Sequence, residues 1–241
     1  MTEVRSAGRL QEILDGAQVA PAVFALRPDY RALLIAVEGV CPGHSDASSD
    51  ALLKRAEATA AQLLADATVD QLPHIAAWRE TYRSFGAKPQ RTRNSLEALT
   101  RRAATGLPRV NRLTDTYNAI SVLHQVPLGG EDLAGYRGSP RLLRATGSEP
   151  FDTAVDGELV VEHPDTGEVV WCDDAGVTCR RWNWRQGRRT QLTAETTAAL
   201  FILDALAPLT DDALTAAADD LVAHLKHLAP GLQVATQLLR A

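Results

Sequence analysis

Apolar and polar positions follow their clearest pattern between residues 111 and 123. Leu113, Tyr117 and Ile120 recur at the spacing of an α-helix, so the pattern predicts a helix that turns this stripe toward the core. A second apolar run, over residues 30–40, stops at a Cys-Pro-Gly sequence and predicts a buried strand. The chain is therefore expected to mix helices and strands.

The other elements are predicted from periodicity, caps and turn signals. Helical patterns occupy residues 51–67, 72–82, 96–104, 193–206 and 211–228. Strand patterns occupy residues 141–145, 158–163, 168–172 and 177–184. Pro-Asp-Thr-Gly and Asp-Asp-Ala-Gly turns separate the later strands and predict an antiparallel meander. Residues 232–241 fit either a short strand or a packed tail.

The back of the helix over residues 111–123 is unusually polar. Asn111, Asp115 and Asn118 are four and then three residues apart, so they lie on the side opposite the apolar stripe. A solvated helix surface would use Lys and Glu, because Asn and Asp are poor helix formers. One interpretation is a polar face that borders a pocket, and the other is a capped core helix with a solvated back.

A glycine pair follows this helix. Pro127 ends the helical pattern, and Gly129 and Gly130 precede Asp132. Glycine permits backbone geometry and close approach that other residues resist, so the segment predicts a tight turn. If the polar helix face borders a pocket, this turn is expected to face the same pocket. The alternative is an ordinary turn without a ligand.

Composition and cysteine usage narrow the class of protein. The 241 residues allow one large domain or two small ones, and 45% hydrophobic and 23% charged residues are ordinary for a soluble globular chain. The sequence has no run of 18 apolar residues and no apolar segment near its start, so neither a membrane span nor a secretion signal is expected. Three cysteines without a Cys-x-x-Cys pair favour a reducing cytoplasm and no metal site.

Positive charge is concentrated in two segments, although the net charge is −5. Residues 79–112 carry nine Lys or Arg and two Glu, and residues 180–189 carry five Arg and no acid. Such a surface can bind a phosphate backbone locally. Within the first segment, Lys88, Arg91 and Arg93 occupy a predicted loop before a helix start, where free N–H groups also favour anions. The alternative is a solvated surface of a chain that prefers Arg.

The second basic segment contains two tryptophans. If residues 177–184 form a strand, Trp182 and Trp184 share one face, and Arg181, Asn183 and Arg185 share the other as the alternation continues. Paired Trp side chains usually indicate burial in the core. The alternating Arg-Asn-Arg face is neither apolar nor typical of a sheet edge, so it is a candidate for binding phosphates or a nucleobase.

Five stretches together resemble a known family. They are WRETYRSFGAKPQRTRNSLEALTRR, LPRVNRLTDTYNAIS, VPLGGED, LLRATGSEPF with VDGE, and CRRWNWRQ, spread over about half of the chain. In order and spacing they are similar to the B3/B4 domain of the phenylalanyl-tRNA synthetase β subunit, in its freestanding form. The resemblance implies an α+β fold, with an antiparallel sheet sandwich and packed helices. It implies a single B3/B4-type domain over residues 1–241, with a helical C-terminal segment over residues 193–241.

The same resemblance implies a function. In the synthetase, this domain receives the aminoacylated end of tRNA and hydrolyses wrongly attached amino acids, and a freestanding copy is expected to edit in trans. The expected partner is tRNA, with no DNA, membrane or cofactor. In the synthetase domain a His stands shortly before the conserved Asp of the turn, where this chain has Gly129, and a Glu stands in a glycine-rich segment that matches residues 181–186. The chain therefore either edits with other groups or binds tRNA or an amino acid without hydrolysis.

Hydrolysis of the ester needs only a positioned water and a stabilised oxyanion, and several residues are candidates for these roles. A nucleophile is not expected, because the sequence has no Gly-x-Ser-x-Gly motif and no convincing Cys-His pair. Asn118 or Asn183 could hold the water or the oxyanion, and Asp115 could orient the water or bind the amino group. The expected substrate-binding residues are Asn111, Gly129, Gly130, Asp132 and Trp182, and the expected RNA-binding residues are Lys88, Arg91, Arg93, Arg181 and Arg185.

Overall fold

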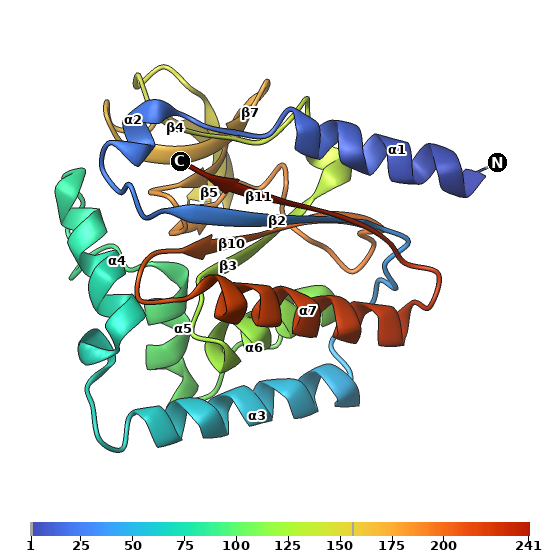
Figure 1. Cartoon of the computed structure of the whole chain (residues 1–241), viewed down its shortest axis with the longest axis horizontal. Coiled ribbons are helices and arrows are strands. Elements are labelled where there is room, and N and C mark those ends of the chain that lie inside the picture. The colour runs from blue at the N-terminus through green and yellow to red at the C-terminus, as the bar shows by residue number, and fades with distance from the viewer. Residues whose placement is uncertain (1, 156) are drawn as a thin grey trace.

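Two β-sheets form the centre of the computed structural model, which describes residues 2–155 and 157–241 (Figure 1). The first sheet has the order β1-β4-β7-β8-β9 and is antiparallel except for the parallel β1–β4 pair. Its strands are β1 (Gln18–Val19), β4 (Arg141–Arg144), β7 (Val169–Asp173), β8 (Gly176–Arg180) and β9 (Arg185–Gln186). This sheet forms one wall of the interior.

The second sheet is fully antiparallel and has the order β11-β2-β10-β3. Its strands are β11 (Gln233–Arg240), β2 (Arg31–Glu38), β10 (Ala198–Ala205) and β3 (Leu128–Asp132). A separate hairpin pairs β5 (Phe151–Val155) with β6 (Glu158–Glu162). The long central strands β2 and β10 are almost entirely buried, as expected for strands that are covered on both faces.

Helices cover the second sheet and flank the first (Figure 1). The α-helices are α1 (Thr2–Asp15), α2 (Pro21–Phe24), α3 (Ala47–Leu63), α4 (Pro73–Ser84), α5 (Ser95–Ala103), α6 (Arg112–Leu123) and α7 (Asp211–Leu228). The 3-10 helices are η1 (Val69–Gln71) and η2 (Leu133–Gly135). Side chains of Asp46, Asn94, Asn111 and Thr210 accept hydrogen bonds from backbone N–H groups at the starts of α3, α5, α6 and α7, which stabilises those ends.

The core has two main layers on either side of the second sheet. Between the two sheets, an aromatic group that includes Tyr30, Trp78 and Trp182 packs edge to face, with ring centroids 4.9 to 6.4 Å apart. On the other face, α6 and α7 pack against β2, β3 and β10. Helix α3 packs outside α6 and forms a further layer. The architecture confirms the predicted α+β class with antiparallel sheets and packed helices.

Most predicted helices are confirmed, but the helix predicted over residues 193–206 is wrong. Residues 198–205 instead form β10, the strand between β2 and β3. An apolar run of this length carries no period that distinguishes a buried strand from a buried helix. Burial on both faces of a central strand removes the alternation that would have identified it. The C-terminal segment is therefore only partly helical, and residues 233–240 form β11.

Two further predictions about the strands are wrong. Strand β8 stops at Arg180, because Arg181 and Trp182 adopt left-handed backbone φ angles of 47° and 67°. The predicted alternating Arg-Asn-Arg face therefore does not exist. The meander is also interrupted, since β6 pairs with β5 rather than with β7. The tight turn expected at the glycine pair is also wrong. These residues instead belong to strand β3, in which Gly129 lies opposite Ile202 of β10.

Among the described residues, no helix is long and apolar enough to cross a membrane.

Candidate active site

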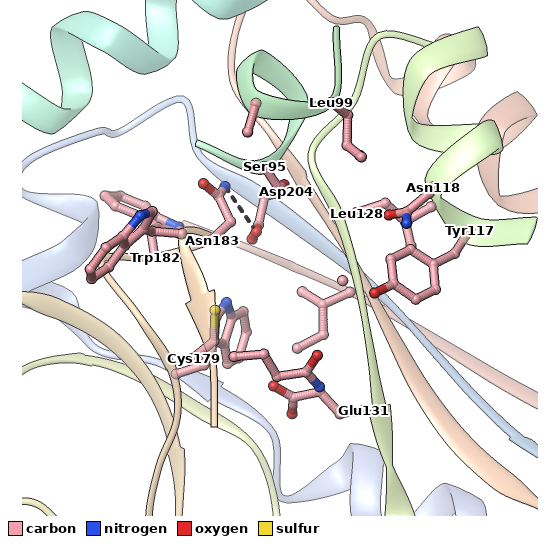
Figure 2. Close-up of a pocket in the computed structure, with 16 residues that line it drawn as sticks. Ser95, Leu99, Tyr117, Asn118, Leu128, Glu131, Cys179, Trp182, Asn183 and Asp204 are labelled. Carbon is pink, nitrogen blue, oxygen red and sulfur yellow. Dashed lines mark hydrogen bonds between the residues drawn. The ribbon is translucent and has the colours of Figure 1, made fainter. Parts of the chain in front are cut away.

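A cavity of about 260 Å³ lies between the two sheets, beside α5 and α6 (Figure 2). It is lined by Ser95, Ala98, Leu99, Tyr117, Asn118, Leu128, Gly129, Glu131, Trp171, Cys179, Trp182, Asn183, Trp184, Gln186, Ile202 and Asp204. Ala98 of α5 is exposed, so the cavity opens beside this helix. The walls are mostly aromatic and aliphatic, with a few polar groups, as is typical of pockets that bind small groups.

Asp204 and Asn183 form a hydrogen-bonded pair in this cavity (Figure 2). Asn183 Nδ2 donates to Asp204 Oδ2 at 3.1 Å, and Asn183 Oδ1 accepts from the Tyr82 hydroxyl at 2.9 Å. The Tyr30 hydroxyl donates to Asp204 Oδ1 at 2.5 Å. Burial raises the pKa of Asp204 from 3.8 to about 7, although the polar contacts with Tyr30, Asn183 and Trp171 oppose this rise. This carboxyl can therefore exchange a proton near neutral pH.

A second carboxyl, Glu131, lies elsewhere in the same cavity (Figure 2). Its side chain projects from β3, is only 3% exposed, and accepts a hydrogen bond from the Tyr136 hydroxyl. Burial raises its pKa from 4.5 to about 7. Two titratable groups with pKa values shifted toward neutrality in one cavity are typical of functional sites.

Sequence reasoning missed both carboxyls. Asp204 interrupts the run AALFILDA, and an acid inside such a segment is a signal that could have identified it. Glu131 lies two residues beyond Gly129, so both point to the same side of β3. No sequence signal shows that this side faces the cavity, because strand register is decided by tertiary packing.

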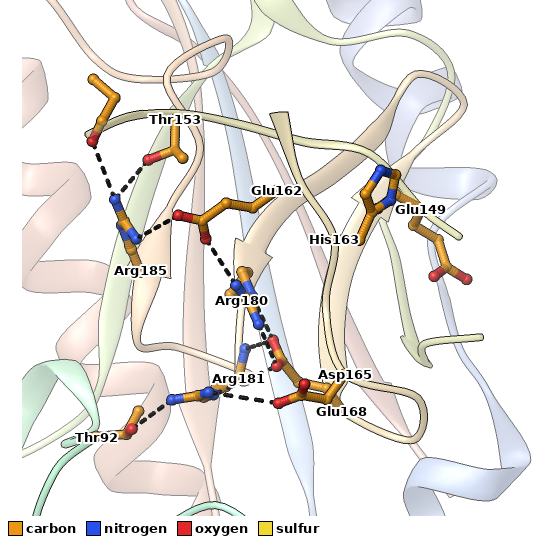
Figure 3. Close-up of polar contacts among 11 residues, drawn as sticks. Thr92, Glu149, Thr153, Glu162, His163, Asp165, Glu168, Arg180, Arg181 and Arg185 are labelled. Atoms are coloured by element: carbon orange, nitrogen blue, oxygen red, sulfur yellow. Dashed lines mark hydrogen bonds and ion pairs between the residues drawn. The ribbon is translucent and has the colours of Figure 1, made fainter. Parts of the chain in front are cut away.

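A buried ion-pair cluster anchors the turn that carries Asn183 (Figure 3). Glu168 accepts two hydrogen bonds from the Arg180 guanidinium, at 2.8 and 2.9 Å, and one from the Arg181 backbone N–H at 3.2 Å. Left-handed backbone at Arg181 and Trp182 costs about 1 to 3 kcal/mol each and persists only where surrounding contacts enforce it. Glu168 thus supports the turn that places Asn183 in the cavity.

Replacing Glu168 with Ala is expected to lower the free energy of unfolding by about 3 to 5 kcal/mol, because it leaves the buried Arg180 without its main counterion. Urea denaturation of both proteins measures the difference. Glu162→Ala is the matched control: Glu162 also pairs with Arg180 but is 30% exposed, so its loss is expected to cost no more than about 1 kcal/mol. Equal costs for the two variants would contradict this assignment.

The structure brings some of the predicted site residues together and separates others. Asn118, Gly129, Trp182 and Asn183 line the cavity. Asp115 does not: it is fully buried at the start of α6, where it accepts hydrogen bonds from the Val110 N–H at 2.8 Å and from the Ser49 hydroxyl. The polar back of the predicted helix therefore does not face one pocket as a set.

Asn111 and Asp132 also lie outside the cavity lining. Asn111 is the N-cap of α6, where its Oδ1 accepts from the Thr114 N–H and its Nδ2 donates to the Leu192 carbonyl oxygen. Asp132 accepts from the Ala134 N–H at 2.8 Å and thereby caps η2. Both side chains satisfy backbone groups at element ends, which is the common use of Asn and Asp at such positions.

The two glycines of β3 have opposite surroundings. A Cβ built on Gly129 would meet no atom within 4 Å, so this position leaves open space beside the cavity. A Cβ on Gly130 would lie 2.8 Å from the Leu192 side chain and 2.9 Å from the Phe201 ring. Gly129 therefore keeps the cavity open, whereas Gly130 permits close packing of the core behind it.

The predicted RNA-binding side chains fall into two groups. Lys88, Arg91 and Arg93 are exposed on the segment that leads into α5, next to the cavity mouth. Arg181 stacks on Trp184 at 4.6 Å and bonds to Glu168, and Arg185 bonds to Thr153 (Figure 3). The exposed group is therefore the more available to phosphates.

Thiol and metal chemistry find little support in the cavity. Burial raises the pKa of the Cys179 thiol well above its usual value, so the reactive thiolate is disfavoured. In the part of the chain that the structure describes, no three His, Cys, Asp or Glu side chains form a group that could hold a metal ion. The polar groups among the lining residues are carboxyls, carboxamides, hydroxyls and indole N–H groups.

Comparison with known proteins places the chain in a family. No curated protein matches it. Among solved structures, it is similar to an N-terminal fragment of the phenylalanyl-tRNA synthetase β-subunit from Pyrococcus horikoshii, with 11% sequence identity and a TM-score of 0.45. That alignment covers 93% of this chain and 54% of the fragment, so the chain spans about half of the fragment's length. The family model of the B3/4 domain matches residues 77–229, more than half of the chain. The chain therefore belongs to the B3/4 domain family.

Proposed function

We propose that this protein hydrolyses the ester bond of mischarged aminoacyl-tRNA in trans, with the cavity between the two sheets as its active site. Membership in the B3/4 domain family supports a tRNA-related function. The observation that carries the proposal is the buried Asn183–Asp204 pair, whose carboxyl has a pKa of about 7 in a cavity open beside α5. A carboxyl of this kind is suited to general base catalysis at neutral pH.

The reaction follows from these groups. Deprotonated Asp204 accepts a proton from a water molecule, while Asn183 holds the carboxylate in place. The water oxygen attacks the ester carbonyl carbon, and collapse of the tetrahedral intermediate breaks the bond to the ribose oxygen. The departing ribose oxygen takes the proton from Asp204 and becomes a hydroxyl, which regenerates the base. This role falls to Asp204 rather than to Asp115, because Asp115 lies outside the cavity.

Donors for the developing oxyanion are present in the cavity walls. The carboxamide of Asn118 lines the cavity. The indole N–H groups of Trp171 and Trp182, which also line it, are buried and form no hydrogen bond of normal geometry with the described residues, although that of Trp171 lies close enough to Asp204 to lower its pKa. Donors aimed at developing negative charge are usually a large contribution to ester hydrolysis. A ligand oxygen would satisfy donors that the protein itself leaves unpaired.

The tRNA is expected to lie across the mouth of the cavity. Lys88, Arg91 and Arg93 are exposed just before Ser95, which is itself part of the cavity lining. Cations on this segment can contact phosphates near the acceptor end while the aminoacyl group enters the cavity. The binding is therefore expected to weaken as salt increases.

A second candidate is a module that binds tRNA or an amino acid without hydrolysis. One observation favours it: both amide atoms of Asn183 and both oxygens of Asp204 already have hydrogen-bond partners in the protein. A carboxylate oxygen accepts more than one hydrogen bond, so these contacts leave room for a water. The two candidates differ in whether the ester is cleaved.

The test is a deacylation assay with a panel of tRNAs charged with correct and incorrect amino acids. The purified protein is expected to release the amino acid selectively from one or a few mischarged species, faster than buffer alone. Stable esters throughout the panel, together with salt-sensitive tRNA binding, would reject the deacylase and support the binding module.

A further inference from the structure

The cavity has an unusual charge balance. Asp204 and Glu131 both contribute carboxyls, whereas none of its described lining residues is Lys, Arg or His. A buried carboxylate without a cation is costly, and burial accordingly holds both pKa values near neutrality. The cavity is therefore complementary to a ligand that brings positive charge.

Glu131 is the carboxyl that lacks a role in the proposed hydrolysis. Its hydrogen bond comes from Tyr136, a neutral donor. The nearby cation Arg189 is engaged by Asp173, with two hydrogen bonds of 2.7 and 2.8 Å. Arg189 is thus committed to another carboxylate, and Glu131 keeps acceptor capacity toward the cavity.

The position of Glu131 relative to the Asn183–Asp204 pair determines which part of the substrate it would contact. Figure 2 shows Glu131 at one end of the cavity and the Asn183–Asp204 pair at another. Gly129 leaves open space on the same strand as Glu131, two residues away. With the ester at Asp204, the side chain of the amino acid would extend past Gly129 and end at Glu131.

The size of the cavity agrees with an amino-acid ligand. At about 30 Å³ per water-sized group, the volume of about 260 Å³ holds roughly nine such groups. This is enough for one amino acid of moderate length. Trp171, which lines the wall, presents an aromatic surface that tolerates a cation better than an aliphatic one does.

We infer that Glu131 is a specificity-determining residue, which selects aminoacyl groups whose side chain ends in an ammonium. The inference rests on the proposed function for the placement of the ester. It also draws on the Ser95 hydroxyl, which lines the cavity, is buried and forms no hydrogen bond with the described residues, an independent sign that a ligand completes this cavity. A substrate ammonium would form a charge-assisted hydrogen bond with Glu131, whereas a neutral side chain of equal length would leave the carboxylate with only its hydrogen bond from Tyr136.

The test compares one tRNA charged in turn with lysine, ornithine and norleucine, which matches ornithine in side-chain length but lacks the ammonium. Wild-type protein is expected to prefer the two cationic esters on the order of 10- to 100-fold in kcat/KM. Glu131→Gln is expected to lose this preference while retaining its circular dichroism spectrum. Glu195→Gln, an exposed site outside the cavity lining, is the control and keeps the preference.

A binding measurement separates this inference from the proposed function. Calorimetry compares lysinamide with norleucinamide, neither of which requires an ester or tRNA. Tighter binding of lysinamide by the wild type, lost in Glu131→Gln, supports the inference even if the protein cleaves no ester. In that case only the proposed deacylase activity is rejected. The inference is overturned if the norleucine compound is hydrolysed or bound as well as the lysine compound. The proposed deacylase activity is still supported in that case if the ester is cleaved.

Discussion

Replacing Gly129 with Val is expected to reduce the deacylation of mischarged tRNA on the order of 100-fold or more while the protein stays folded. An added Cβ at this position meets no atom within 4 Å, so the Val methyl groups would project into the open space of the cavity. They would displace the aminoacyl group from its position, and a displacement of about 1 Å can cost about 100-fold in rate. Valine suits a β-strand better than glycine does, which favours folding of the variant.

The neighbouring glycine supplies the matched comparison. A Cβ at Gly130 would press on the Leu192 side chain at 2.8 Å and on the Phe201 ring at 2.9 Å. Gly130→Ala is therefore expected to lower the free energy of unfolding by about 1 to 3 kcal/mol through overpacking. Deacylation rates and urea unfolding of both variants distinguish the two effects. A Gly129→Val protein that deacylates at the wild-type rate would show that the cavity is not the active site.

Replacing Asp204 with Asn is the second change with a large expected effect. It removes the proposed general base at nearly constant volume, and the deacylation rate is expected to fall about 100- to 10,000-fold. Asp204 acts as a base only when deprotonated, and its pKa in the folded protein is about 7. The wild-type rate is therefore expected to rise between about pH 6 and pH 8 and then level off, whereas the variant loses this rise.

Single-turnover rates over this pH range measure both expectations. Asp220→Asn on α7, a carboxyl that pairs with His124 and lies outside the cavity lining, is the control and keeps the wild-type profile. The same stepwise rise in the Asp204→Asn protein would assign the titration to another group. Glu131, with its pKa of about 7, would then be the first group to examine.

The positions of most helices follow from local signals that act within a few residues. The apolar stripe of Leu113, Tyr117 and Ile120 correctly predicted α6, and the helical pattern over residues 96–104 correctly predicted α5. Asn111 illustrates the limit of such signals. Its polar side chain was interpreted as facing a ligand, but it caps the helix that it begins, and spacing alone does not distinguish the two uses.

The errors arise where tertiary packing decides the conformation. The run FILDAL belongs to a strand that is covered on both faces, so apolar and polar residues do not alternate along it. Without this alternation, its sequence predicts a helix instead of β10. Trp182 and Asn183 line the cavity, but the left-handed turn that carries them is supported by Glu168, which is distant in sequence. Glu131 and Asp204 meet in one cavity only through the pairing of β3 with β10.

The proposal that the cavity hydrolyses the ester is tested most directly with the panel of charged tRNAs. Wild-type and Gly129→Val proteins are assayed side by side. We expect selective deacylation by the wild type and its loss in the variant, with tRNA binding unchanged in both. Equal deacylation by the two proteins would contradict the assignment of the cavity as the site of hydrolysis.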